Sequence, residues 1–109
     1  MMSNVTNIKS LYVLCNAGYA GDLIEIAREA GAKGATIINA RGGGALREAI
    51  MGITVDSERE IILILAEEAM AMEIMLAIKS KMGYESPARS ICFTLPVEQL
   101  IGIDLGQIE

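Results

Sequence analysis

The sequence predicts an α+β fold in which two helices cover one face of a four-stranded antiparallel sheet. Short β-type runs and two helical segments follow one another in the order β-α-β, loop, β-α-β, so one unit is used twice. The 109 residues suffice for one domain with a single core. The third β-type run is apolar throughout 61–66, which is typical of a strand inside a sheet.

The first unit begins with a strand over Leu11 to Cys15, which ends at a turn containing Gly18. A helix is expected from Ala20 to Ala30, with Gly31 as its stop signal. Its apolar residues recur on one face, at Leu23, Ile24, Ala27 and Ala30. The second strand, Ala35 to Ala40, is rich in β-branched side chains.

The second unit begins with a strand over Arg59 to Glu67. A helix follows, whose N-terminus is favoured by Glu67 and Glu68 and which ends at Gly83. The helix is expected to bury a stripe made of Ala69, Met72, Met75 or Leu76, and Met82. A fourth strand follows in the run SICFTLPV. Pro96 cannot donate a ladder hydrogen bond, so this strand is expected at the sheet edge or to end near the proline.

The arrangement that accommodates both units is ferredoxin-like, with strand order 4-1-3-2 along the sheet. One alternative stays open. If Ala45 to Met51 formed a full crossover helix, the chain would instead be a small parallel α/β sheet, although the flanking glycines leave that helix barely two turns.

Composition excludes several classes of function. The net charge of −5, without a basic cluster, argues against nucleic-acid binding. The chain has no histidine, the usual general base and the commonest metal ligand, so neither a hydrolytic triad nor a metal site is expected. The apolar runs are too short to span a membrane, and no secretory signal is visible.

The apolar content of 52% is high for a small soluble domain and favours an oligomer. Cys15 and Cys92 are expected to be reduced core residues on adjacent strands, which suits the cytoplasm.

Three consecutive glycines follow the second strand and are flanked by arginines. Gly42, Gly43 and Gly44 would let backbone amides approach an anion closely, and Arg41 and Arg47 could bind it with parallel hydrogen bonds. The stretch fits neither G-x-G-x-x-G nor a P-loop. It is therefore either an anion site or the hinge of a mobile loop.

Three stretches resemble the PII signal-transduction (nitrogen regulatory) proteins. CFTLPVEQLIGI (Cys92 to Ile103) is similar to the end of the family's sheet, EAGAKGATI (Glu29 to Ile37) to its first helix end and second strand, and RGGG (Arg41 to Gly44) to the entry of its long T-loop. The resemblance implies a cytoplasmic homotrimer of ferredoxin-like subunits. Family members bind ATP or ADP between subunits, often with 2-oxoglutarate, and engage transporters or enzymes through the T-loop without being catalysts.

The same resemblance divides the chain into a single domain over 1–109, with flexible residues at 1–9, a T-loop-like segment at 42–58 and a C-terminal tail at 104–109. The sequence departs from the family in four places. The phosphate-binding Gly-Asp-Gly-Lys turn is replaced by ESPARSI (Glu85 to Ile91), and two C-terminal arginines by Gly102 and Asp104. No tyrosine lies in 42–58, and a basic residue at the start of the third strand falls at or beside Glu60, with Arg59 as its substitute.

With these departures, the resemblance implies a divergent PII-like regulator that is expected to bind a small anionic metabolite or adenine nucleotide, such as ATP, ADP or AMP, and to act on a transporter or enzyme. The expected ligand-binding residues are Thr36, Arg41, Gly42, Gly43, Gly44, Arg47 and Arg89. For Thr36, strand packing is the alternative role, and for Arg89, a solvated turn position. Two other functions remain open, a docking subunit that has lost nucleotide binding and a small ferredoxin-like enzyme.

Overall fold

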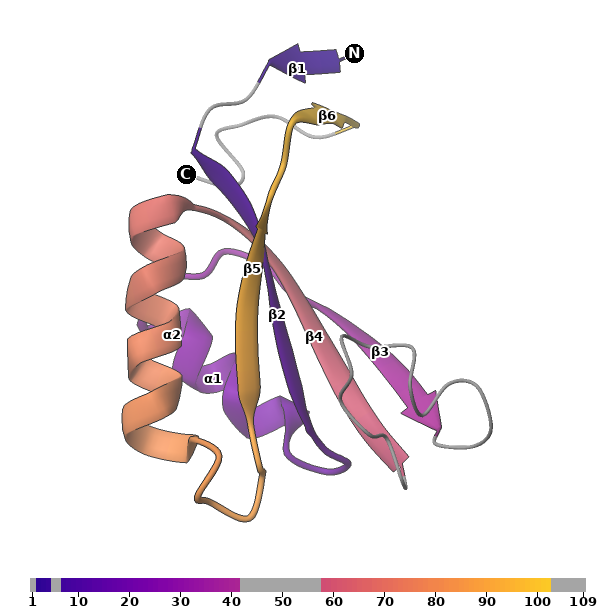
Figure 1. Ribbon diagram of the computed structural model, residues 1–109, viewed down its shortest axis with the longest axis vertical. Helices are drawn as coiled ribbons and strands as arrows, with labels where there is room; N and C mark the ends of the chain where they lie inside the picture. Colours follow the sequence, from indigo (N-terminus) through magenta and orange to yellow (C-terminus); the bar gives the residue numbers. More distant parts are fainter. Residues whose placement is uncertain (1, 5–6, 42–57, 103–109) are drawn as a thin grey trace.

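A computed structural model describes residues 2–4, 7–41 and 58–102 of the chain and has the expected ferredoxin-like architecture (Figure 1). Two helices cover one face of a four-stranded antiparallel sheet whose order is β3-β4-β2-β5. The strands are β2 (Ile8–Asn16), β3 (Thr36–Arg41), β4 (Glu58–Glu67) and β5 (Ile91–Pro96), and the helices are α1 (Ala20–Glu29) and α2 (Glu68–Met82). Counted along the chain, this is the predicted strand order 4-1-3-2.

The pairing of the strands rules out the alternative parallel sheet. β3 runs antiparallel to β4, with Thr36 opposite Leu63 and Arg41 opposite Glu58. Antiparallel neighbours can be joined without a crossover helix. The proposed helix over 45–51, like most of the T-loop-like segment, lies outside the described residues.

The prediction for the last strand is confirmed. β5 pairs with β2 and occupies the edge of the sheet, and it ends at Pro96. Proline has no amide hydrogen for a further ladder bond, so the strand stops there. Two short strands that the sequence does not predict, β1 (Met2–Asn4) and β6 (Gln99–Ile101), form a separate antiparallel pair.

The core lies between the helices and the sheet. Side chains alternate between the two faces of a strand, and one set from each central strand packs against α1 and α2. This set comprises Leu11, Val13 and Cys15 of β2 together with Ile62, Ile64 and Ala66 of β4. From α1 it meets Ala20, Leu23, Ile26 and Ala27, all buried.

The buried stripe predicted for α2 is wrong. The helix buries Ala71, Ile74 and Ile78, which lie on one face at helical spacing. Met72 and Leu76 are instead 54% and 56% exposed. Ala69 is also exposed, whereas Met75 and Met82 are partly buried beside the core. Apolar residues lie on more than one face of α2, so periodicity alone selected the wrong one.

The other face of the sheet carries no described helix (Figure 1), and we call it the helix-free face. Ladder register and alternation place an apolar set there, namely Tyr12, Leu14, Ile38, Ile61, Leu63, Leu65, Ile91, Phe93 and Leu95. The rings of Tyr12 and Phe93 stack with centroids 5.1 Å apart. Ile38 and Leu95 are 44% and 45% exposed, so this face presents apolar surface to its surroundings.

Within the described residues, neither helix has the length and hydrophobicity needed to cross a membrane.

Candidate functional site

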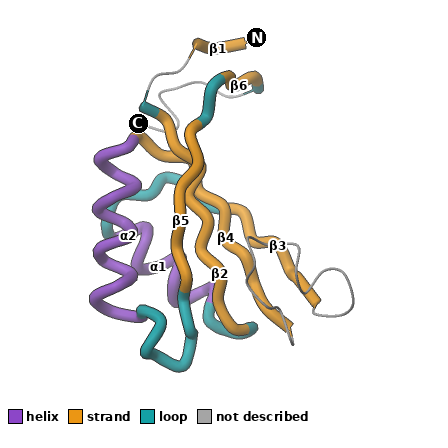
Figure 2. The backbone as a smooth tube through the Cα atoms, in the orientation of Figure 1, coloured by secondary structure: helices purple, strands orange, loops and turns teal. Residues whose placement is uncertain are grey.

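The turn after β2 and the segment between α2 and β5 both lie at one end of the sheet, the lower end in Figure 2. The ladder register brings the last residue of β2 opposite Arg59 of β4, and Arg41 of β3 opposite the neighbouring Glu58. We call this end of the sheet, with Arg41, Arg59 and Arg89, the arginine end.

Asn16, the last residue of β2, makes two hydrogen bonds to the segment that precedes β5. Its backbone N–H donates to the Ala88 carbonyl at 2.9 Å, and its side-chain Nδ2 donates to the Pro87 carbonyl at 2.9 Å. The segment before β5 is therefore held against the end of β2 by two hydrogen bonds from one residue.

The side chain of Arg59 makes two further hydrogen bonds at the same end of the sheet. Its Nε donates to the Cys15 carbonyl at 3.4 Å, and its Nη2 donates to the Arg89 carbonyl at 3.2 Å. A guanidinium group has five N–H donors in a planar fork, so three remain after these two bonds. Because the side chain is half-buried and held at both sides, its position is well defined.

Arg89 is exposed, and its backbone adopts φ +50°, a left-handed conformation that a non-glycine residue rarely takes. Its Nη1 donates to the Tyr84 carbonyl at 3.2 Å, and its Cζ lies 5.4 Å from the centroid of the Tyr84 ring. The guanidinium is thus folded onto its own turn by a hydrogen bond and a cation–π contact. Its remaining donors can still meet an anion at the arginine end.

Glu60 occupies the N-terminus of α1. Its Oε1 accepts hydrogen bonds from the backbone N–H groups of Gly18 at 2.8 Å and Ala20 at 3.2 Å. A carboxylate is favoured at the positive end of the helix dipole. Since the Glu60 carboxylate already binds these two amides and carries a negative charge, it disfavours a ligand anion at the α1 N-terminus, and Arg59 and Arg89 are the described cationic side chains to consider at this end.

The structure brings only part of the predicted ligand set together. Arg89 lies at the arginine end, and the backbone of Arg41 reaches it through the register of β3. Thr36 is exposed at the other end of β3, roughly 17 Å along the strand at about 3.3 Å per residue, so one subunit does not join it to the arginines. Gly42, Gly43, Gly44 and Arg47 lie outside the described residues.

Sequence reasoning named Arg59 only as a substitute for a missing basic residue, and it did not foresee that Glu60 caps α1. Both contacts join positions that are distant in sequence, such as Glu60 and Gly18. The one available signal was an adjacent Arg-Glu pair at the start of an interior strand, where charges need partners.

The two cysteines are free thiols, with Cys15 buried and Cys92 partly buried. Burial raises the pKa of each to about 11, with the charge of Glu60 contributing at Cys15. They lie on neighbouring strands and face the core side of the sheet, since Cys92 pairs with Val13. Among residues 2–4, 7–41 and 58–102, no three His, Cys, Asp or Glu side chains form a group that could hold a metal ion.

The chain matches the family model of nitrogen regulatory protein P-II over residues 8–107. No curated protein sequence matches it significantly. Among solved structures, it is similar to a PII-like signalling protein from Thermus thermophilus, with 20% identity, a TM-score of 0.61, and coverage of 85% of this chain and 86% of that one.

It is also similar to CPII from Thiomonas intermedia bound to ADP, AMP and acetate, with 14% identity, a TM-score of 0.67, and coverage of 99% of this chain and 97% of that one. A second CPII structure, bound to ADP, AMP and bicarbonate, has 13% identity, a TM-score of 0.63, and coverage of 95% of this chain and 100% of that one. At these identities the structural likeness concerns the fold.

Proposed function

Because the chain belongs to the nitrogen regulatory protein P-II family, we propose that it is a non-enzymatic cytoplasmic signalling protein that binds an adenine nucleotide or another small anion. The observation that carries the proposal is the arginine end. Arg59 and Arg89 are tied together through the Arg89 carbonyl, and Arg41 reaches the same end. The guanidinium groups of Arg59 and Arg89 both belong to this end, and their remaining N–H donors match the planar oxygens of a phosphate or a carboxylate.

The proposed assembly is a homotrimer. The helix-free face supports it, because a monomer of this size would leave a wide apolar sheet surface in water. In such an assembly the arginine end of one subunit would meet a neighbour, and Thr36, remote within the subunit, could join the ligand site from the adjacent chain. The segment 42–58 would then transmit ligand binding to a partner protein, a transporter or an enzyme.

The ligand class is tested by thermal unfolding of the protein with ADP, AMP, ATP, 2-oxoglutarate and bicarbonate, with native mass measured in parallel. A ligand at a hundredfold its Kd stabilises the folded state by about 2.7 kcal/mol. We expect ADP or AMP to give such a shift. Bicarbonate is a second expected ligand, since CPII, which has the same fold, was solved with it.

Variants locate the site. Arg89→Ala and Arg41→Ala should each remove most of the ligand-induced stabilisation. The matched control is Arg28→Ala, because Arg28 is an exposed arginine of α1 paired with Glu25 at 3.5 Å and lies away from the arginine end. An equal response in Arg89→Ala, Arg41→Ala and the unaltered protein would move the anion site elsewhere.

A docking subunit without nucleotide binding is the second candidate. One observation favours it. Arg89, the single basic residue of 85–91, uses its guanidinium group for a hydrogen bond and a cation–π contact with Tyr84 in its own turn. A trimer whose unfolding temperature responds to none of the ligands would support this function over the first.

A further inference from the structure

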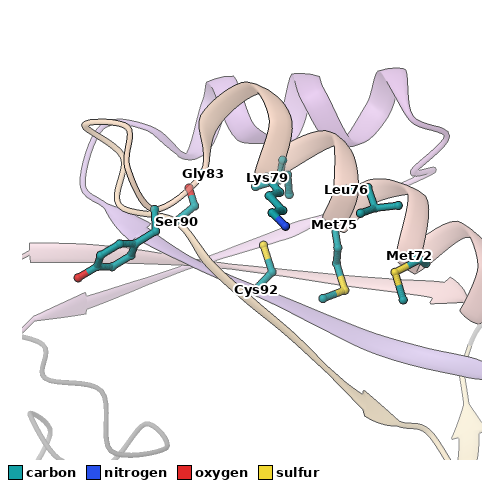
Figure 3. Close-up of a pocket in the computed structure, with 9 residues that line it drawn as sticks. Met72, Met75, Leu76, Lys79, Gly83, Ser90 and Cys92 are labelled. Carbon is teal, nitrogen blue, oxygen red and sulfur yellow. The ribbon is translucent and has the colours of Figure 1, made fainter.

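A cavity of about 310 Å³ lies between α2 and the edge strand β5 (Figure 3). Met72, Met75 and Leu76 line it from the helix, and Ser90 and Cys92 line it from the strand side. Most of its lining is apolar. Ligand pockets of this kind pair an apolar wall with a few placed polar groups.

The cavity arises because small side chains face a helix at the sheet edge. Ser90 and Cys92 fill much less space than the leucines and isoleucines of the central strands. The methionines above them are unbranched and adaptable, so they line the space without fixing its shape. Such a lining can adjust to an apolar guest.

One polar residue that lines the cavity, Ser90, has a hydroxyl group without a partner among the described residues. Ser90 is 6% exposed, and within the described part of the chain its Oγ forms no hydrogen bond. Buried hydroxyl groups nearly always have a hydrogen-bond partner, because a buried hydroxyl group without a hydrogen bond costs free energy. Since this Oγ is itself fully buried, a rotation of the side chain toward the cavity would let it donate a hydrogen bond to a ligand atom there.

The cavity also has one cation. Lys79 extends from α2 toward the cavity, on the side of Cys92 (Figure 3). Among the described residues it has no ion-pair partner, whereas Lys81 on the same helix lies 4.0 Å from Glu29. Burial raises the pKa of the Cys92 thiol to about 11, so this thiol is neutral at pH 7 and does not neutralise the lysine. One unpaired positive charge beside an apolar wall favours a single anionic group.

We propose that this cavity binds a small apolar carboxylate, with its hydrocarbon part against Met72, Met75 and Leu76 and its carboxylate between Lys79 and Ser90. An apolar cavity of about 150 Å³ holds one benzene molecule, so this cavity has room for roughly ten to twelve non-hydrogen atoms. A medium-chain carboxylate such as octanoate has that size. A nucleotide does not fit this chemistry, since its phosphates need more than one cation.

The test is a titration of the full-length protein, labelled with ¹³C in its methionine methyl groups, with octanoate. Saturable shifts are expected at Met72 and Met75, and none at Met70, which packs near Gly31 on the other side of the helix. Octanol serves as the uncharged analogue of the same chain length.

Two variants report on the carboxylate. Lys79→Met keeps the side-chain length but removes the charge, and it should weaken octanoate binding about tenfold while changing octanol binding little. Lys81→Met is the matched control on the same helix and should change neither. Ser90→Ala should fold normally, because the hydroxyl has no partner among the described residues, and should weaken octanoate binding severalfold.

Three results would overturn the proposal. The first is an octanoate Kd weaker than about 1 mM, where the binding free energy is too small for a specific site. The second is unchanged octanoate affinity in Lys79→Met, which would make the cavity an unselective apolar space. The third is a response of Met72 and Met75 only when subunits dissociate, which would make the groove a contact with a second copy of the chain. The nucleotide proposal is tested through Arg41 and Arg89 instead, so it stands or fails separately.

Discussion

At the scale of single residues, Glu60 shows how one side chain arranges a site without being its ligand. Its carboxylate binds two backbone amides at the N-terminus of α1. The side chain of the adjacent Arg59 holds the carbonyls of Cys15 and Arg89. Neighbouring residues of one strand thus fix the first helix and the turn before the last strand.

We predict that Glu60→Gln lowers the free energy of unfolding by about 1 to 2 kcal/mol, since it weakens two charge-assisted hydrogen bonds at a helix N-terminus. Urea unfolding followed by circular dichroism measures the change. Glu73→Gln, an exposed glutamate on α2, is the control and should change stability by less than about 0.5 kcal/mol. Equal effects of the two substitutions would show that the cap contributes nothing.

The two cysteine thiols lead to a prediction about protein stability at alkaline pH. Burial raises the pKa of both thiols from 9.0 to about 11 in the folded chain. A raised folded-state pKa contributes stability that is complete below pH 9 and is lost as the pH rises through 11, because the unfolded chain releases the protons first.

Unfolding in urea should therefore become easier between pH 9 and 11, and less so in the double variant Cys15→Ala, Cys92→Ala. Tyrosines and lysines titrate in the same range, so the difference between the two proteins is the quantity to compare. At pH 8, alkylation of the native thiols should be about a hundredfold slower than in the unfolded chain, since the thiolate is the nucleophile. Parallel pH profiles for both proteins would contradict this assignment.

At the scale of elements, α2 shows where reasoning from periodicity fails. Strands β2 and β4 were predictable because each contains a short apolar run of β-type residues, Leu11 to Cys15 and Ile61 to Ala66, and the turn at Gly18 marks the end of β2. On α2, alanines, methionines, leucine and isoleucines surround most of the helix, so several faces look equally apolar. The sheet selects Ala71, Ile74 and Ile78, and that choice depends on tertiary packing.

Two substitutions on α2 test which face of the helix is buried. Ile74→Ala removes a fully buried side chain and should cost about 2 to 5 kcal/mol of unfolding free energy. Leu76→Ala, at a residue that is 56% exposed, should cost less than about 1 kcal/mol. Denaturant midpoints of both variants check this, and a larger loss from Leu76→Ala would restore the stripe expected from the sequence.

At the scale of the whole molecule, topology was predictable and the ligand site was only partly so. The order of the strands follows from the repeated unit and from the uninterrupted apolar run of β4. The site depends on contacts that no local pattern contains, such as Arg59 with Arg89 or Asn16 with Ala88. Its glycine stretch, Gly42 to Gly44, lies outside the described residues.

The helix-free face leads to a prediction about assembly. Leu63→Glu places a carboxylate in the centre of this face, opposite Tyr12, and should convert the proposed trimer into monomers by burying an unpaired charge at the interface. Native mass spectrometry measures the state, and circular dichroism shows whether the variant is folded.

The control for this prediction is Leu76→Glu on the exposed side of α2, which should assemble like the unaltered protein. A folded Leu63→Glu protein that remains trimeric would place the subunit contact on another surface.

Strand pairs that join distant parts of the sequence determine when each strand can find its partner during synthesis. Met2 lies opposite Ile101, and β2 needs both β4 and β5 as neighbours. On the ribosome, β2 therefore has no partner strand until β4, which ends at Glu67, has emerged. One edge of β2 stays unpaired until β5, which ends at Pro96, has emerged as well. Contacts this distant in sequence slow folding, and an unpaired interior strand is prone to aggregation while it waits. Nascent chains of this protein are therefore expected to depend on chaperones until the last strand leaves the exit tunnel.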